Sequence, residues 1–195
     1  MDRDYHALPI RELGAGAGFR RPAQAQAARV TGESPALHAM TDLARVSPAT
    51  IRPQAPLAGA NQFMITRGVR LLLVVDEAHE KVLGVITAAD LLGERPMLVA
   101  TDRGLRRDEL TVADVMTPAR QVEAIALADV EAARVGHILE TLRRAGRAHL
   151  LVVDADSTVR GIFSLSQIAR QLGVSPEPGS EVARTFSEIE AALAR

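Results

Sequence analysis

Two short runs of consecutive apolar residues stand out in the hydrophobic pattern of this chain, at residues 71–75 and 150–153. Both runs are too short for a helix and rich in β-branched residues, which is typical of strands buried on both faces. Each is followed by a polar turn and a second apolar stretch, at residues 82–86 and 159–163. The pattern therefore predicts two pairs of neighbouring strands.

Helical spacing precedes each pair of strands. Leu57, Ala60 and Met64 recur on one face of a segment that begins after Pro56 and stops at Gly68, the usual placement of proline and glycine at helix ends. The later segment repeats this spacing with Ala132, Val135, Leu139 and Leu142 and stops at Gly146. The spacing predicts one amphipathic helix before each strand pair.

Further elements complete each copy. Residues 49–51 and 122–127 read as extended pieces ahead of the helices, and Thr87 and Ser164 each open a short helix after the second strand. The order in both copies is strand, helix, strand, strand, helix.

The two copies also share sequence. Residues 72–76 return at 150–154, residues 84–87 return in similar form at 161–164, and Met40-Thr41 returns as Met116-Thr117. The offsets are similar and the order is the same, which indicates a duplicated unit. The predicted fold class is α/β (α+β) with two tandem units.

The limits of this repeated pattern divide the chain into segments. We expect a flexible N-terminal arm at 1–33, a first unit at 34–93, a linker at 94–110, a second unit at 111–173 and a tail at 174–195. Within the linker, residues 106–109 form a charge run that we expect to lie in solvent.

The tail predicts a last amphipathic helix. Val182, Phe186, Ile189 and Leu193 recur at helical spacing behind a possible cap at Ser180. This helix either contacts a second chain or covers the core of its own chain, and the second role is the one we favour.

Composition narrows the function. With 23 basic and 24 acidic side chains the net charge is −1, so no overall positive field attracts nucleic acid or an anionic membrane. The chain has no cysteine, which fits a reducing compartment, and its apolar runs are too short to cross a bilayer. The first residues do not resemble a secretion signal. We expect a cytoplasmic protein with no nucleic-acid or membrane partner.

Patterns typical of enzymes are absent from the sequence. The five histidines show no metal-ligand spacing, and there is no Gly-x-Ser-x-Gly turn and no P-loop. We expect no enzymatic activity, no metal and no obligatory cofactor.

The duplicated pattern resembles the CBS domain, named for cystathionine β-synthase. The resemblance lies in an apolar strand ending in Val-Val-Asp, a turn, and Gly-h-h-Thr/Ser-x-x-Asp, where h is apolar, and it covers roughly residues 34–173. Two such units in tandem resemble a Bateman module. The resemblance implies two units packed about a pseudo-twofold axis, and a free-standing CBS-pair protein of bacterial type that forms a homodimer through its helices.

The resemblance also implies a ribose site. In the family, the Thr or Ser and the Asp of this segment hold the two ribose hydroxyls of an adenosine nucleotide, and here Thr87 and Asp90 match them. A carboxylate can accept hydrogen bonds from both hydroxyls of a diol. The alternative is structural, because Thr87 with Asp90 and Ser164 with Gln167 also have capping-box spacing.

The second copy departs from this pattern, since Gln167 stands where the aspartate is expected. An amide accepts a weaker hydrogen bond than a carboxylate, so either one nucleotide binds per chain or the second site is altered.

Other candidate contacts follow from the same resemblance. Basic residues ahead of the first buried strand bind phosphate in the family, and we assign this position to Arg70 and His149, with Arg67, Arg144 and Arg147 nearby. Helix-end arginines in solvent are the alternative. Ile51, Val85 and Ile86 are the candidate walls of an adenine slot, with core packing as the alternative and as the favoured role of Ile86. Thr50 is a further candidate ligand contact, and Ser164 is the candidate hydroxyl of the second site.

The predicted function is a regulatory module that binds an adenosine ligand (AMP, ADP, ATP or S-adenosylmethionine) and signals to an unknown regulated protein. The alternative is a ligand-free CBS scaffold that mediates protein assembly, which the glutamine at 167 favours. A hydrolase or nucleotide-modifying enzyme is a third class, for which the sequence provides no base or metal site.

Overall fold

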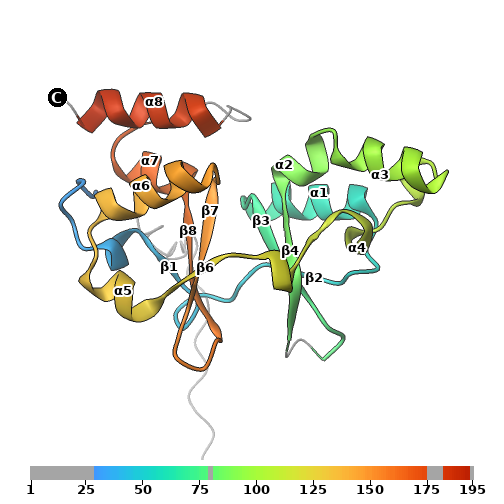
Figure 1. Cartoon of the computed structure of the whole chain (residues 1–195), viewed down its shortest axis with the longest axis horizontal. Coiled ribbons are helices and arrows are strands. Elements are labelled where there is room, and N and C mark those ends of the chain that lie inside the picture. Colours follow the sequence, from blue (N-terminus) through green and yellow to red (C-terminus); the bar gives the residue numbers. More distant parts are fainter. Residues whose placement is uncertain (1–28, 79–80, 175–181, 194–195) are drawn as a thin grey trace, which may run out of the picture.

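The computed structural model of the chain describes residues 29–78, 81–174 and 182–193. These residues form two four-stranded sheets with helices packed against each, and the two halves stand side by side (Figure 1). The predicted α/β fold with two tandem units is confirmed. Most of the predicted N-terminal arm and the proposed cap Ser180 lie outside the described residues.

The first sheet has the strand order β2-β3-β4-β5. Its strands are β2 (Thr50–Ile51), β3 (Leu71–Val75), β4 (Val82–Thr87) and β5 (Thr117–Pro118). Strands β2 and β3 are parallel, and the other neighbours are antiparallel. The accompanying helices are α1 (Leu57–Arg67), α2 (Ala88–Leu92), α3 (Arg95–Arg103) and α4 (Val112–Val115), with the 3-10 helix η2 (Arg107–Glu109).

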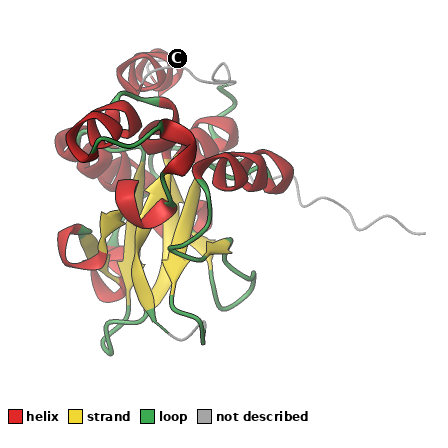
Figure 2. Cartoon of the chain, turned by 90° about the vertical axis from the view of Figure 1, so that its right-hand side faces the viewer, coloured by secondary structure: helices red, strands yellow, loops and turns green. Residues whose placement is uncertain are grey.

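The second sheet has the order β1-β8-β7-β6. Its strands are β1 (Thr41–Asp42), β6 (Ala124–Ala126), β7 (His149–Val153) and β8 (Val159–Ser164). The accompanying helices are α5 (Leu127–Ala132), α6 (Val135–Ala145), α7 (Leu165–Gln171) and α8 (Val182–Leu193), with the 3-10 helices η1 (Ala36–Ala39) and η3 (Ala119–Gln121). Figure 2 shows the strands in the centre, with most helices around their upper part and short helices beside them.

Side chains on the two faces of β3 enter different cores, because successive side chains of a strand point to opposite faces. Leu72 and Val74 lie in a core with residues of α1 and α2. Leu71, Leu73 and Val75 lie in another core, together with Val85 and with Leu151 of the second sheet. This explains why β3 is a continuous apolar run, and it shows that the two halves contact each other through the opposite faces of their sheets.

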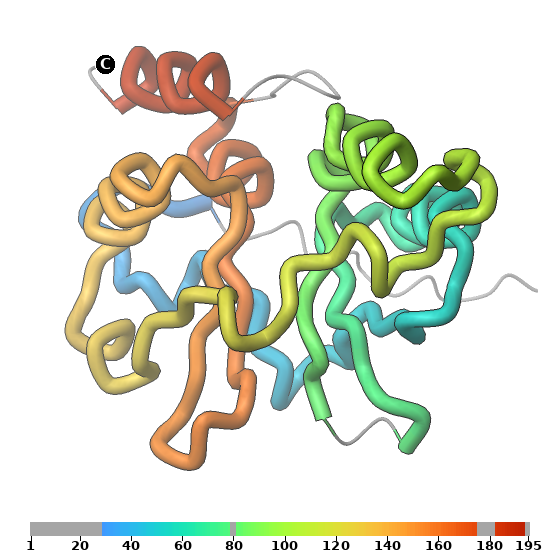
Figure 3. Tube along the Cα trace, turned by 45° about the vertical axis from the view of Figure 1, so that its right-hand side comes forward, coloured from blue at the N-terminus to red at the C-terminus, as the bar shows by residue number. Residues whose placement is uncertain are grey.

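Each half receives a strand from the segment that precedes the other half. Strand β1 pairs with β8, and β5 pairs with β4 (Figure 3 shows the blue N-terminal part beside the orange half). The sequence places residues 34–42 with the first unit and residues 111–118 with the second, whereas the sheets pair these segments the other way. An ion pair between Asp42 and Arg160 joins β1 to β8.

Two equivalent glycines make this exchange possible. A Cβ on Gly84 would meet the backbone oxygen of Thr117 and would lie 3.1 Å from the Cα of Pro118. A Cβ on Gly161 would meet the side chain of Met40. The glycine of the repeated Gly-h-h-Thr/Ser segment therefore leaves room for the incoming strand.

The end of the predicted arm is docked rather than loose. Val30 is buried in the core of the second half, and its amide donates to the carbonyl of Gln171 at 3.1 Å. The amide of Gly136 donates to the carbonyl of Gly32 at 2.9 Å. Residues 30–33 are thus part of the second half.

Helix ends match the sequence pattern in most places. Gly68 and Gly146 end α1 and α6 in the left-handed conformation, with φ of 65° and 62°. The predicted strand at 122–127 is too long, because Leu127 already opens α5. Ala132 ends α5 and does not begin α6, since Ala133 and Arg134 are extended where residues 34–36 pair with them.

The predicted linker contains a helix that the sequence analysis missed. Helix α3 has Pro96 in its first turn, a position that proline favours, and ends at Gly104 in the left-handed conformation. Met97 and Leu98 on this helix are 58% and 66% exposed. The charge run at 106–109 is exposed, as predicted.

The tail helix is confirmed as α8. Phe186 and Ile189 are buried in the core of the second half, 8% and 1% exposed, so α8 covers its own chain as favoured. Figure 1 shows α8 lying over α6 and α7.

Candidate functional site

Thr87 and Asp90 lie together at the start of α2 and form a capping box. Thr87 Oγ1 accepts from the amide of Asp90 at 3.3 Å, and Asp90 Oδ2 accepts from the amide of Thr87 at 2.9 Å. The Thr87 hydroxyl also donates to Asp90 Oδ2 at 2.7 Å. The predicted capping role is confirmed, and it leaves Asp90 Oδ1 pointing to other partners.

Arg95 is a part of this site that the sequence analysis missed. Its Nη1 donates to Asp90 Oδ1 at 3.2 Å and to Thr117 Oγ1 at 3.3 Å, and its Nη2 donates to the carbonyl of Met116 at 3.0 Å. The side chains of Arg95 and Asp90 are 41% and 19% exposed. One guanidinium therefore connects α2 and α3 with β5, the strand that arrives from the second unit.

His149 comes close to this site from the second half. Burial and, to a smaller extent, the charge of Arg70 lower the pKa of His149, the charge of Asp90 opposes them, and the resulting pKa is about 4. The histidine is therefore neutral at physiological pH. Residues from both units, Asp90 and Arg70 from the first and His149 from the second, share one electrostatic environment.

The strand register corrects one predicted equivalence. His149 pairs with Ser164, and in the first sheet Leu71 pairs with Thr87. His149 therefore corresponds to Leu71, and Arg70 corresponds to Ala148, whose carbonyls accept from the residues that begin α2 and α7. Arg70 and His149 are one position apart in the repeat, although they lie near each other in space.

The other candidate arginines have partners at the surface. Arg67 lies over the ring of Phe63, with 5.6 Å from its guanidinium carbon to the ring centroid. Arg144 pairs with Glu140 at 2.6 Å, and Arg147 pairs with Glu123 at 3.1 Å. These contacts agree with the alternative reading, in which helix-end arginines lie in solvent.

The adenine candidates separate into two places. Val85 is 7% exposed in the core between the sheets, and Ile86 is fully buried on the opposite face, as expected. Thr50 and Ile51 line an open pocket of about 400 Å³. Its other lining residues are Arg52, Ala55, Gly59 and Phe63. Thr87, Asp90 and Val85 are not among the residues that line this pocket.

The equivalent site of the second half is closed differently. Gln167 Oε1 accepts from the hydroxyl of Thr41 at 3.0 Å, which ties α7 directly to β1. Ser164 stands at the N-cap of α7, but its side chain makes no capping hydrogen bond and lies 3.1 Å from Ser166 Oγ. The predicted cap by Ser164 is therefore wrong, because the side chain at position 167 turns to Thr41 instead of the helix start.

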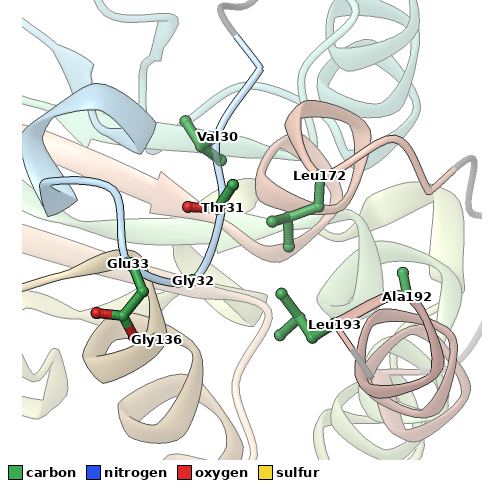
Figure 4. Close-up of a pocket in the computed structure, with 8 residues that line it drawn as sticks. All are labelled: Val30, Thr31, Gly32, Glu33, Gly136, Leu172, Ala192 and Leu193. Atoms are coloured by element: carbon green, nitrogen blue, oxygen red, sulfur yellow. The ribbon is translucent and has the colours of Figure 1, made fainter. Parts of the chain in front are cut away.

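A larger pocket lies away from these residues. It measures about 530 Å³ and is enclosed by the segment at 30–33, the starts and ends of neighbouring helices, and the end of α8 (Figure 4). Val30, Leu172 and Leu193 provide most of its apolar side chains. None of the predicted ligand residues belongs to its lining.

Two kinds of feature are absent from the described residues. The parts of the chain that the structure describes hold no cluster of three or more side chains able to bind a metal ion. Within the same ranges, no helix is long and apolar enough to span a bilayer.

Comparison with known proteins agrees with the repeat. The family model described as CBS domain matches twice, at residues 40–96 and 112–173. No curated protein matches the chain.

Two solved structures show a similar fold. An uncharacterized conserved protein from Pyrococcus horikoshii is 21% identical with a TM-score of 0.56, over 77% of this chain and 100% of the other. The structure of CBSX2 in complex with AMP is also 21% identical, with a TM-score of 0.50, over 71% of this chain and 95% of the other. CBSX2 is described as a CBS-pair protein from Arabidopsis thaliana.

Proposed function

Because the chain belongs to the CBS-domain family, whose model matches both of its units, we propose that it is a regulatory module for an adenosine ligand. The ligand is AMP, ADP, ATP or S-adenosylmethionine, and binding changes how the module contacts a regulated protein. The observation that carries this proposal is the Asp90 carboxylate at the start of α2, which shares its surroundings with Arg70 and His149.

The chemistry of these side chains suits a nucleoside phosphate. A carboxylate accepts from the hydroxyls of a ribose diol, and the charge-assisted bonds are stronger than those to a neutral acceptor. Arg70 provides positive charge for a phosphate, and neutral His149 can donate one hydrogen bond and accept another. A similarly folded CBS-pair protein, CBSX2, has been crystallised in complex with AMP, which supports this ligand class.

We place the ligand in the first unit only. In the second unit Gln167 lacks charge, and its acceptor oxygen already bonds to Thr41. A ribose would have to compete with that bond for a weaker acceptor. We therefore expect one ligand per chain.

The scaffold reading is the second candidate, and one observation favours it. Thr87 and Arg95 already occupy the Asp90 carboxylate. If those bonds are permanent, the site serves only to hold α2 in place, and the protein acts through its surfaces alone.

A titration separates the two candidates. Isothermal calorimetry with AMP, ADP, ATP and S-adenosylmethionine should show binding of at least one ligand at one site per chain. Asp90→Asn should weaken it roughly ten- to hundredfold, since a hydrogen bond to a charged group contributes about 1.5–3 kcal/mol. Gln167→Ala should leave the affinity unchanged. A wild-type protein that binds none of the four ligands leaves the scaffold as the function.

For assembly, we propose a homodimer formed through one helix face of the first unit. Leu92, Met97 and Leu98 of α2 and α3 are 65%, 58% and 66% exposed, and Ile65 of α1 is 64% exposed. We call these four residues the α2–α3 face. On the second unit, α8 covers α7 and leaves less apolar surface for a partner. A second copy that uses the α2–α3 face would bury these side chains about a twofold axis.

A further inference from the structure

Arg95 contacts the charged acceptor of the candidate ligand site, the Asp90 carboxylate. Its guanidinium lies between Asp90 Oδ1 on one side and Thr117 Oγ1 and the Met116 carbonyl on the other. These contacts hold the start of α3 against both α2 and β5. A ligand that takes Asp90 therefore affects three elements through one side chain.

Most hydrogen-bond acceptor positions of the Asp90 carboxylate are occupied. Each oxygen of a carboxylate accepts about two hydrogen bonds. Asp90 Oδ2 already accepts two from Thr87, from its amide and its hydroxyl, and Oδ1 accepts one from Arg95. One position remains, whereas a diol that binds through both hydroxyls needs two.

We propose that Arg95 is a gate for the ribose diol: the diol binds Asp90 when the guanidinium leaves Oδ1. The released Arg95 then no longer bridges α2 to β5. This proposal rests on the proposed function, because it assumes that Asp90 is the ribose acceptor.

The second unit lacks such a gate. The position five residues after Gln167 is Leu172, whereas the position five residues after Asp90 is Arg95. Gln167 reaches Thr41 without an intermediate, and Thr41 corresponds to Thr117 in the repeat. The same connection between helix start and incoming strand is thus direct in one unit and made through a cation in the other.

The exposure of the ion pair is suited to exchange. Arg95 is 41% exposed, and ion pairs with such access to water contribute little to stability. When a ligand replaces the guanidinium, Arg95 therefore does not become an unpaired buried charge. Released Arg95 also frees α3, which carries Met97 and Leu98 of the α2–α3 face, so ligand binding reaches the proposed dimer surface.

The test uses the uncharged ligands adenosine and 2′-deoxyadenosine, which exclude attraction between Arg95 and phosphate. Calorimetry should show that Arg95→Gln binds adenosine more tightly than wild type, by up to about fivefold, the range of an exposed ion pair. The affinity for 2′-deoxyadenosine, which offers one hydroxyl fewer, should change less. Arg95→Lys keeps a cation near Asp90 and should restore an affinity close to wild type.

Two further measurements separate a gate from general loosening. Arg103→Gln removes another ion pair of α3, with Asp114, and should leave adenosine binding unchanged. Added NaCl should tighten adenosine binding by wild type, since salt screens the competing pair, but not binding by Arg95→Gln. Hydrogen exchange of the Met116 and Thr117 amides should rise on ligand binding in wild type and should already be high in Arg95→Gln without ligand.

The outcomes identify which proposal fails. Equal affinities of wild type and Arg95→Gln for adenosine reject the gate and leave the proposed function intact. Weaker binding by Arg95→Gln also rejects the gate, because Arg95 then contacts the ligand. Absence of adenosine-ligand binding in every variant rejects the proposed function together with the gate. If Arg95→Gln does not fold, salt dependence that is absent or reversed in wild type rejects the gate.

Discussion

Gly84 and Gly161 set how closely the exchanged strands approach their sheets. Only the first of them faces backbone, the Thr117 carbonyl and the Pro118 Cα, whereas Gly161 faces the flexible side chain of Met40. Backbone cannot move aside as a side chain can, so the two equivalent glycines differ in how much they tolerate a methyl group.

Substitution of these glycines tests that difference. Gly84→Ala should lower the free energy of unfolding by about 2 kcal/mol or more, and Gly161→Ala by less, in urea denaturation. Gly59→Ala is the control, because its Cβ would lie 3.5 Å from Pro56 in ordinary contact within a helix. A loss at Gly84 no larger than at Gly59 would contradict the close approach of β5.

His149 makes stability depend on pH. Its pKa is about 4 in the folded chain, below the ordinary value of 6.5, so the unfolded chain binds a proton first as pH falls. The contribution of this residue is present above pH 6.5 and is lost as pH falls from 6.5 towards 4. Its full size is about 3 kcal/mol, from about 1.4 kcal/mol for each pKa unit.

Urea denaturation across this pH range checks the effect. The free energy of unfolding of wild type minus that of His149→Gln should decrease as pH falls from 7 to 4. A His149 difference that is constant with pH, or that grows on acidification, would refute the effect.

Residue patterns in the sequence predicted the capping pair of the candidate site but not its ion pair. Thr87 and Asp90 were found because a capping box places its two residues within one short motif. Arg95 was not found, because its partners Met116 and Thr117 are more than twenty residues away. The one-residue offset between Arg70 and His149 depends on strand register, which the repeated letters did not fix.

At the scale of elements, residues at helix ends and apolar runs explain the predictions that were confirmed. Pro56 and Gly68 bracket α1 as predicted, and the apolar run of β3 is a strand buried on both faces. The exchange of β1 and β5 was missed because a two-residue strand has no periodicity, and its partner is chosen by the whole fold. Helix α3 was missed because its large apolar side chains, Met97 and Leu98, are exposed and do not mark a buried helix face.

Helix α8 provides a test at this scale. Ile189 is 1% exposed, and Ile189→Ala should lower the free energy of unfolding by about 2–4 kcal/mol, the usual cost of truncating a buried aliphatic side chain. Leu193 on the same helix is 46% exposed, and Leu193→Ala should cost much less. Equal effects in thermal or urea unfolding would mean that α8 is not held against the second half through Ile189.

At the scale of the whole molecule, the two units differ in what their helices present. The second unit carries α8 over α7, while the first unit leaves the α2–α3 face exposed. This asymmetry predicts a dimer with a single interface and no larger assembly, since an isologous contact closes after two copies.

Light scattering tests this assembly. The wild-type protein should have twice the monomer mass of 20.8 kDa, and Leu98→Lys should shift it towards the monomer at micromolar concentration. Leu37→Lys, at a residue 40% exposed in the other half, should leave the mass unchanged. A wild-type mass of one chain would reject the dimer, and loss of the dimer only in Leu37→Lys would move its interface.

The strand exchange bears on how such a chain could arise from a shorter one. A single unit would carry an incoming strand that its own sheet does not use, and its sheet would lack the strand it needs. Two separate copies could complete their sheets only by exchanging strands, as a domain-swapped pair. Gene fusion would join such a pair into one chain. The pairing of β1 with β8 and of β5 with β4 is the pairing that such a fusion would leave.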